Sequence, residues 1–380
     1  MNTRLGVTAE DQEIAQAIAR FAQEQLAPMA QKVDEEEIST VCHVPGLAEL
    51  GVMGMNIPEQ WGGPGISPTA LILSLVEIAK QCASTSSMVG AQYLATDSIL
   101  LGGDDALRER YLPDAAAGLK LGAFALTEPR AGSNPADMAT QAVLEGDYYR
   151  LTGTKHFISN AGEADFIVVY AKTDPKAGHR GISAFVVDKD TPGLTISSPE
   201  KLMGIRGGHA FEVALDCKVP VANRIGAEGT GFITAMKVLD NSRLDVAATS
   251  IGISEAALEA AVFWSQQRKV GGELLSQKQG IQWMLADMKL RLEASWALTL
   301  QACAKRAAGQ RFSQESAMAK LYASEAVGFI TDTALQIHGG YGFTREMPLE
   351  RYVRDARILR IYEGSSEIQR TIIARTLLAE

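Results

Sequence analysis

The residues best suited to chemistry lie in four short segments that are far apart in the sequence. Residues 124–133 (FALTEPRAGS) combine small and hydroxylated side chains, which let backbone N–H groups approach a phosphate or a planar ring. Residues 153–160 (GTKHFISN) place Phe157 two positions before Ser159, so one strand can pack against a ring and hydrogen-bond to it. Considered alone, these segments are better explained as a plain loop and an ordinary β-strand.

The other two segments lie near the C-terminus and border expected helices. Residues 336–342 (QIHGGYG) contain three glycines, which permit a tight helix C-cap and also the close approach of a ligand. In residues 360–370 (RIYEGSSEIQR), Glu363 precedes a glycine and two serines just before a final amphipathic helix. A carboxylate at that place usually serves the helix through capping or its dipole. Considered alone, both segments are better explained by helix capping.

Several common chemical signatures are absent from the sequence. It contains no GxxxxGK[ST], HExxH, GxSxG or GxGxxG pattern. Their absence argues against a P-loop, a zinc-protease site, a hydrolase nucleophile elbow and a Rossmann dinucleotide site. The five histidines and four cysteines are dispersed, so no metal site is predicted.

The composition is typical of a large folded protein. The chain has 380 residues, of which 46% are hydrophobic and 21% charged, with a net charge of −9. At roughly 150 residues per domain this allows two or three domains, and the low charge fraction excludes a mainly disordered chain. The acidic balance argues against a dedicated nucleic-acid-binding protein.

The sequence carries no evident membrane or targeting signal. No apolar run reaches the roughly 18 residues that a membrane span needs, and the N-terminus (MNTRLGVTAEDQ) is polar and acidic. We therefore expect a cytoplasmic, bacterial protein. A processed protein of an organellar matrix would look the same and stays an alternative.

The chain divides into three stretches that differ in the periodicity of their apolar residues, and these stretches must position the four chemical segments described above. Residues 1–120 predict a helical domain, and residues 231–380 predict a bundle of long helices. Between them, residues 121–230 contain β-branched and aromatic runs without long intervening helices, which predicts an antiparallel sheet or barrel. Helices are expected within 14–26, 68–79, 84–101, 232–268, 278–309 and 314–337, and a loop over 56–67.

In their order and spacing, the four segments resemble those of the acyl-CoA dehydrogenase family, most closely the short-chain, butyryl-CoA type. The resemblance covers essentially the whole chain. It implies an α+β fold with an N-terminal helical domain, a central antiparallel β-barrel domain and a C-terminal four-helix bundle. It further implies FAD as cofactor and a homotetramer built as a dimer of dimers. The motifs that carry it also include residues 201–207 (KLMGIRG), 219–220 (VP), 229–232 (GTGF), 239–243 (LDNSR) and 279–287 (QGIQWMLAD).

The resemblance assigns cofactor contacts residue by residue. Leu126 and Thr127 are expected at the pyrimidine edge of the flavin, with Phe157 against its ring system. Arg268 and Gln279 are expected to come from a neighbouring subunit and to hold the pyrophosphate and adenosine portion. The complete implied FAD set is Phe124, Leu126, Thr127, Gly132, Ser133, Phe157, Ile158, Ser159, Arg268, Gln279, Gln336, Gly339, Gly340, Ser365, Ser366 and Glu367.

Glu363 matches the family's general base, which removes the α-proton of an acyl-CoA thioester. The β-hydrogen then leaves as hydride to flavin N5, and the product is a trans-2-enoyl-CoA. Two donors to the thioester carbonyl are implied, each worth roughly 3 kcal/mol. Some branches place the base beside the arginine of the 239–243 segment, where this chain has Ser242, which cannot serve. The implied substrate contacts are Ser133, Asp240, Arg243 and Gly364.

The chain departs from the family pattern at two places. The usual R-x-Q-F-G element reads RKVGG over residues 268–272, so Gly271 replaces an aromatic residue and Val270 a polar one. Loss of that aromatic contact predicts weaker FAD retention. Arg130 and Asn134 stand where the family often has Gly or Ser, and Asp, and they add a cation near the phosphates.

The sequence leaves the substrate partly open. A short or branched acyl chain is favoured, with a pocket floor formed by residues 84–102, where Gln92 and Tyr93 could equally recognise a polar or dicarboxylic group. Further candidates for the floor are Ser86, Ser87 and Met88. Electron-transfer flavoprotein is the implied electron acceptor.

The same fold could also act on an acyl-carrier-protein substrate, as an oxidase, or in a non-oxidative elimination. A remote alternative is a non-catalytic relative that binds flavin or nucleic acid.

Overall fold

The computed structural model describes residues 4–379 and begins with a helical region. Its first helix starts with a capping box, in which the Thr8 side chain accepts from the backbone of Asp11 and the Asp11 carboxylate accepts from the backbone of Thr8. The helices of this region are α1 (Ala9–Phe21), α2 (Ala30–Glu36), α3 (Val44–Glu49), α4 (Pro68–Gln81), α5 (Ala83–Gly102) and α6 (Asp105–Ala116).

A β-sheet follows, with the strand order β6-β7-β3-β2-β4-β5-β8 and β1 paired to β4. Most pairs are antiparallel, as predicted, but β1 pairs with β4 in parallel, and so does the single contact between β2 and β4. Along the chain, β2 and β3 lie between the two parallel partners β1 and β4. The strands are β1 (Gly122–Ala125), β2 (Gln141–Glu145), β3 (Tyr148–Ser159), β4 (Phe166–Lys172), β5 (Ile182–Asp188), β6 (Leu194–Ile196), β7 (Ala210–Pro220) and β8 (Arg224–Ile225).

The sheet is folded over its own core, which gives the middle region its barrel-like character. Along β4, alternate side chains point to opposite faces. Ile167 and Val169 pack with residues of β3, β5 and β7, whereas Phe166, Val168 and Tyr170 pack against α5 and α6. Because both faces are covered, β4 and β5 are apolar along nearly their whole length.

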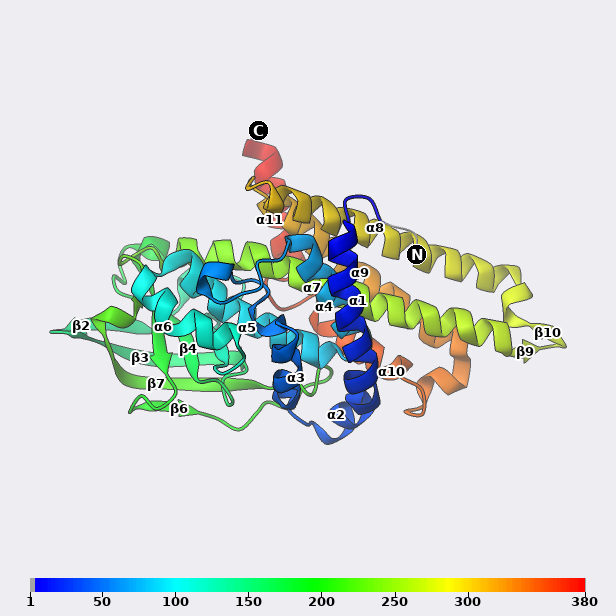
Figure 1. The fold of residues 1–380 in the computed structure, drawn as a ribbon, viewed down its shortest axis with the longest axis horizontal. Helices are drawn as coiled ribbons and strands as arrows, with labels where there is room; N and C mark the ends of the chain where they lie inside the picture. The colour runs from blue at the N-terminus through cyan, green and yellow to red at the C-terminus, as the bar shows by residue number, and fades with distance from the viewer. Residues whose placement is uncertain (1–3, 380) are drawn as a thin grey trace.

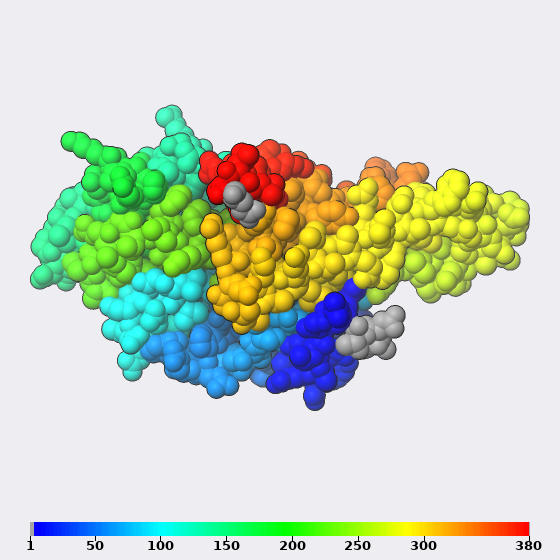
Figure 2. Space-filling view, turned by 90° about the horizontal axis from the view of Figure 1, so that it is seen from above, coloured from blue at the N-terminus to red at the C-terminus, as the bar shows by residue number. Residues whose placement is uncertain are grey.

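The C-terminal region consists of long helices and one small hairpin. Its elements are α7 (Gly231–Gln267), β9 (Lys269–Val270), β10 (Glu273–Leu274), α8 (Gln279–Ala307), α9 (Ser313–His338), α10 (Leu349–Ile358) and α11 (Ser366–Ala379). Helix α7 runs from the sheet at one end of the molecule to the β9–β10 hairpin at the other (Figure 1). The hairpin ends of α7 and α8 project from the rest of the body (Figure 2). The predicted N-terminal helical region, β region and C-terminal helical region are thus confirmed.

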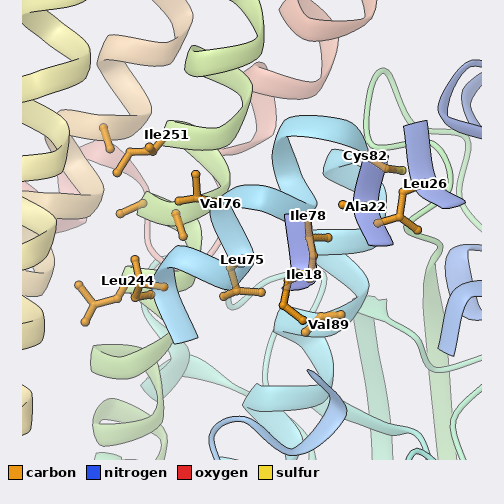
Figure 3. Packing of buried hydrophobic residues seen from close by; sticks show 14 of the residues in the cluster. Ile18, Ala22, Leu26, Leu75, Val76, Ile78, Cys82, Val89, Leu244 and Ile251 are labelled. Atoms are coloured by element: carbon orange, nitrogen blue, oxygen red, sulfur yellow. The ribbon is translucent and has the colours of Figure 1, made fainter. Parts of the chain in front are cut away.

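The core is centred on α4, which is packed between the first helix and α7. Ile18 and Ala22 approach α4 from one side and Leu244 and Ile251 from the other, around side chains such as Leu75 (Figure 3). Helix α7 therefore belongs both to this apolar core and to the layer of helices that packs beside the sheet. A shift of α7 would disturb both regions.

One helix is long and apolar enough to cross a membrane by length and composition, namely α7. The 18-residue stretch of α7 that meets this criterion was not anticipated from the sequence. In the structure, 67% of that stretch is buried inside the protein. Core helices of soluble proteins meet the same criterion, and α7 packs against α4, α5, α8 and α9. We therefore interpret α7 as a core helix.

A buried ion pair ties the loop after β1 to β3. Lys155 is 0% exposed, and its Nζ donates to the Glu128 carboxylate at 2.8 Å and to the Leu126 carbonyl at 3.1 Å. The Glu128 carboxylate also accepts from the backbone N–H groups of Ala139 and Thr140. Burial lowers the pKa of Lys155 to about 8. The pair fixes the loop because Lys155 and Glu128 are both buried and hydrogen-bonded to the loop backbone.

We expect Lys155→Met to lower the free energy of unfolding by about 3–5 kcal/mol, because it leaves the Glu128 carboxylate buried and uncompensated. The double variant Lys155→Met/Glu128→Gln should recover part of the loss, since it removes the buried charge, although the single amide oxygen can accept from only one of the two backbone N–H groups. Urea unfolding of both proteins measures the difference. A double variant as unstable as the single one would contradict this account.

Candidate active site

Most of the predicted site residues line one cavity of about 530 Å³, where the sheet meets the helices. Its wall comes from α5, β1 and the loop after it, the end of β3, α7, the loop before α11, and α11. The segments at 124–133, 153–160 and 360–370 therefore meet in space. The predicted residues in the wall are Phe124, Leu126, Thr127, Gly132, Ser133, Phe157, Ile158, Ser159, Arg243, Glu363 and Gly364.

The end of β3 presents an aromatic ring to the cavity. The register of β3 against β7 shifts between Lys155 and Ile158, so the strand bulges there. Phe157 has φ of 58°, which is uncommon for a bulky residue, and it is 59% exposed. The ring of His156 stacks on it at 4.0 Å, and the Nε2 of His156 lies 2.9 Å from the Glu200 carboxylate. The bulge thus turns Phe157 out of the strand and leaves much of its ring open.

The loop after β1 completes a flat wall beside Phe157. The backbone N–H of His156 donates to the Thr127 carbonyl at 2.9 Å, which fixes the loop against β3. At Gly132 the position of a Cβ would be open space. Hydroxyls come from Thr127, Ser133 and Ser159. This wall combines the exposed ring of Phe157, open space beside Gly132 and several hydroxyls. Such a wall suits a planar group with polar edges.

Glu363 lies in the loop that joins α10 to α11, here called the 359–365 loop. It has φ of 54°, and the next residue, Gly364, has φ of 90°. Two successive left-handed residues turn the chain sharply, so the Glu363 side chain points into the cavity wall and not along α11. Its Oε2 is buried without a hydrogen-bond partner in the described part of the chain.

Burial raises the pKa of Glu363 to about 7. The Ser242 hydroxyl and the charges of Lys320 and Arg243 act in the opposite direction and lower this pKa, but burial is the larger effect. A carboxylate with a pKa near 7 is a much stronger base than one in water, yet it remains ionised in a large fraction of molecules at neutral pH. The arrangement can remove a weakly acidic proton from a group bound in the cavity.

Arg243 lies in the cavity wall, whereas Asp240 stands behind it. Arg243 forms an ion pair with Asp240 one helical turn earlier, and the Ser313 hydroxyl donates to the same carboxylate at 2.5 Å. The structure therefore places Asp240 outside the cavity wall, where it orients Arg243. A direct substrate contact by Asp240 stays a prediction.

A second group of predicted cofactor residues lies elsewhere on the molecule. The guanidinium of Arg268 stands 5.7 Å from the Tyr341 ring centroid, and the Trp264 ring stacks on His338 at 5.0 Å. These contacts join the end of α7 to the end of α9. The predicted residues in this exposed region are Arg268, Gln279, Gln336, Gly339 and Gly340, and none of them lines the cavity. Within the described residues one chain does not bring the two groups together.

The start of α11 holds the remaining predicted cofactor residues. Ser366 is buried, and its hydroxyl donates to Glu325 at 2.7 Å, so it is engaged within the chain. Ser365 is partly exposed and Glu367 fully exposed. None of the three lines the cavity, and their contacts with a cofactor stay predictions.

The expected pocket floor on α5 is only partly right. Ser87 lines the cavity, but Gln92 bridges the Gly122 N–H and the Ala115 and Lys120 carbonyls, and Tyr93 donates to the Val52 carbonyl. Ser86 bonds to Thr249, and Met88 is buried in the core. These side chains were misplaced because α5 is buried around most of its circumference, so the sequence shows no preferred face.

Sequence reasoning also missed several residues at the site. The cavity wall includes Met236, Leu239, Ile368, Ile372 and Arg375 from α7 and α11. Their spacing of three and four residues marks one face of each helix, which was a usable signal. Lys320 and Gln369, which contact the backbone of the 359–365 loop, were also missed.

The comparisons with known proteins agree over the whole chain. Three family models match in succession, the N-terminal, middle and C-terminal domains of acyl-CoA dehydrogenase, over residues 8–119, 123–217 and 229–378.

Individual relatives are similar over their full length. An acryloyl-CoA reductase (NADH) of Anaerotignum propionicum is 42% identical over 97% of this chain and 94% of its own. A short-chain-specific acyl-CoA dehydrogenase of Clostridium acetobutylicum is 38% identical over 97% and 98%. The solved butyryl-CoA dehydrogenase of Megasphaera elsdenii superposes with a TM-score of 0.96 at 38% identity, covering 100% of both chains. The chain therefore belongs to the acyl-CoA dehydrogenase family, whose members are FAD-dependent oxidoreductases.

Proposed function

We propose that this protein oxidises a short-chain acyl-CoA thioester to its trans-2-enoyl-CoA, with Glu363 as the general base that removes the α-proton. The observation that carries the proposal is the Glu363 carboxylate itself. Its Oε2 is buried and unpartnered in the wall of a cavity large enough for a ligand, and its pKa is raised to about 7. A carboxylate in this state is poised to accept a proton from a bound molecule.

The cavity wall fits the cofactor of the family. The open ring of Phe157, the gap at Gly132 and the hydroxyls of Thr127, Ser133 and Ser159 match a planar, polar-edged ring system in shape and chemistry. The chemistry supplied by bound FAD is acceptance of the β-hydride. The protein's share is to align the substrate with that acceptor and to exclude water.

The loop that carries Glu363 also offers a donor to the substrate. In the described structure the backbone N–H of Glu363 makes no hydrogen bond within the chain. An N–H group next to the base is well placed to polarise the thioester carbonyl as negative charge develops on its oxygen. This effect acidifies the α-proton, which an ordinary carboxylate could not remove.

Several features support a short acyl chain and an oligomer. The relatives named for short-chain and butyryl-CoA activity match the whole chain. The Tyr362 side chain is half-buried beside Ser87 and forms part of the cavity wall. The exposed region with Arg268 and Gln279 would complete the site of a neighbouring subunit in the proposed homotetramer. Electron-transfer flavoprotein is the proposed electron acceptor, and a cytoplasmic location stays a prediction.

We expect Glu363→Gln to retain flavin and to lower kcat with butyryl-CoA by about 100-fold or more, the usual contribution of a general base. The amide keeps the size of the side chain but cannot accept the proton. Glu109→Gln, at an exposed position on α6, is the matched control and should have normal activity. Turnover of Glu363→Gln near the wild-type rate would refute the assignment.

The raised pKa predicts the pH dependence of the reaction. Only the ionised carboxylate accepts a proton, so kcat/KM should fall as pH decreases through about 7 and level off above it. Steady-state assays with butyryl-CoA from pH 5.5 to 9 test this. A kcat/KM that stays constant down to pH 5.5, as a glutamic acid with the ordinary pKa of about 4.3 would give, would contradict the burial argument.

We expect FAD to dissociate more readily than is usual in the family. Gly271 and Gly272 form the two-residue turn of the β9–β10 hairpin, with φ of 65° and 85°, so this turn does not present an aromatic side chain. A lost aromatic contact of about 1 kcal/mol weakens binding roughly fivefold. The flavin-to-protein ratio before and after dialysis measures the effect, and a fully loaded protein after extended dialysis would be evidence against it.

A further inference from the structure

The conformation of the 359–365 loop is imposed by groups outside it. Glu363 and Gly364 have φ of 54° and 90°, and a left-handed glutamate persists only where its surroundings hold it. The carbonyl oxygens of these two residues are the points at which the loop is held. Both accept hydrogen bonds from buried side chains of neighbouring helices.

Two donors converge on this backbone. The Lys320 ammonium, on α9, donates to the Gly364 carbonyl at 2.7 Å. The Gln369 amide, on α11, donates to the same carbonyl at 2.9 Å and to the Glu363 carbonyl at 3.3 Å. Both side chains are 0% exposed. A Cβ at Gly364 would stand 2.6 Å from the Gln369 amide nitrogen, so glycine is required for this contact.

The Lys320 ammonium is unusual because it is buried without an ion pair. No carboxylate oxygen in the described residues lies within 4 Å of it, and the group that accepts its hydrogen bond is the neutral carbonyl of Gly364. A buried cation without a counterion is costly, and such groups concentrate at functional sites. Glu363, Glu325 and Glu367 act on it only at longer range.

We propose that Lys320 and Gln369 are positioning residues, which hold Glu363 aimed into the cavity, and that the charge of Lys320 also favours the ionised form of this carboxylate. The proposal rests on the proposed function of Glu363 as the base. The two residues share the mechanical task, but only Lys320 carries charge. Their roles can therefore be separated by experiment.

The charges around Glu363 and Lys320 come from three helices. Arg243 and Asp245 on α7 and Lys320 on α9 interact with Glu363, whereas Glu325 on α9 and Glu367 on α11 interact with Lys320. Burial lowers the pKa of Lys320 to about 8, so it is largely protonated at neutral pH. Lys320 and Arg243 both lower the pKa of Glu363. Removing the charge of Lys320 therefore leaves only the Ser242 hydroxyl and Arg243 to oppose the effect of burial on the pKa of Glu363.

The test compares Lys320→Met and Gln369→Met, which preserve side-chain volume, as flavin-loaded holoenzymes with butyryl-CoA. Lys32→Met, at an exposed position on α2, is the control. We expect kcat to fall by about 100-fold in both variants, because a small displacement of a reacting group costs this much. In Lys320→Met the acid limb of kcat/KM should also move to higher pH, whereas in Gln369→Met it should stay in place.

Each result decides the proposal. A wild-type kcat in Gln369→Met overturns it, and so does an acid limb of kcat/KM that does not move in Lys320→Met. A change in melting temperature alone does not support the proposal, because a purely structural role would lower stability and leave kcat and the acid limb unaffected. If Lys320→Met does not accumulate as holoenzyme, kcat of Gln369→Met alone decides. Wild-type protein that does not turn over acyl-CoA would instead refute the proposed function.

Discussion

The burial of one carboxylate, that of Glu363, is the constraint on which the rest of the structure depends. Removal from water raises the pKa of this carboxyl group to about 7, which makes its ionised form a stronger base than a glutamate in water. The cost is an unpartnered oxygen, a left-handed backbone and a buried lysine nearby. A stable core must offset these local costs, and the α4-centred cluster of apolar side chains provides it.

Helix α7 connects that core to the site. Its middle carries Leu244 and Ile251 into the main cluster, while Leu239 and Arg243 reach the cavity wall. The opposite wall depends on the bulge in β3, which exposes Phe157, and on the Lys155–Glu128 pair, which fixes the adjoining loop. The cavity therefore lies between α7 on one side and the end of β3 with its adjoining loop on the other. Such an arrangement can hold reacting groups to the tolerance that catalysis requires.

The sequence predicted the long helices well because their apolar periodicity is local. The sequence also identified Glu363 as a candidate base, because the segment around it resembles a motif of the family. It did not predict the parallel β1–β4 pair or the bulge before Ile158, because register depends on distant pairing partners. Lys320 was missed because a lysine in a helix normally indicates an exposed face, and here it is fully buried.

The central claim is that this cavity binds a short-chain acyl-CoA beside a flavin and that Glu363 starts its oxidation. An anaerobic titration of the flavin-loaded protein with acyl-CoAs of increasing chain length, followed by flavin absorbance, tests it most directly. The account predicts that a short-chain acyl-CoA bleaches the flavin band stoichiometrically without any added acceptor. A flavin that stays oxidised with every acyl-CoA in the series would contradict it.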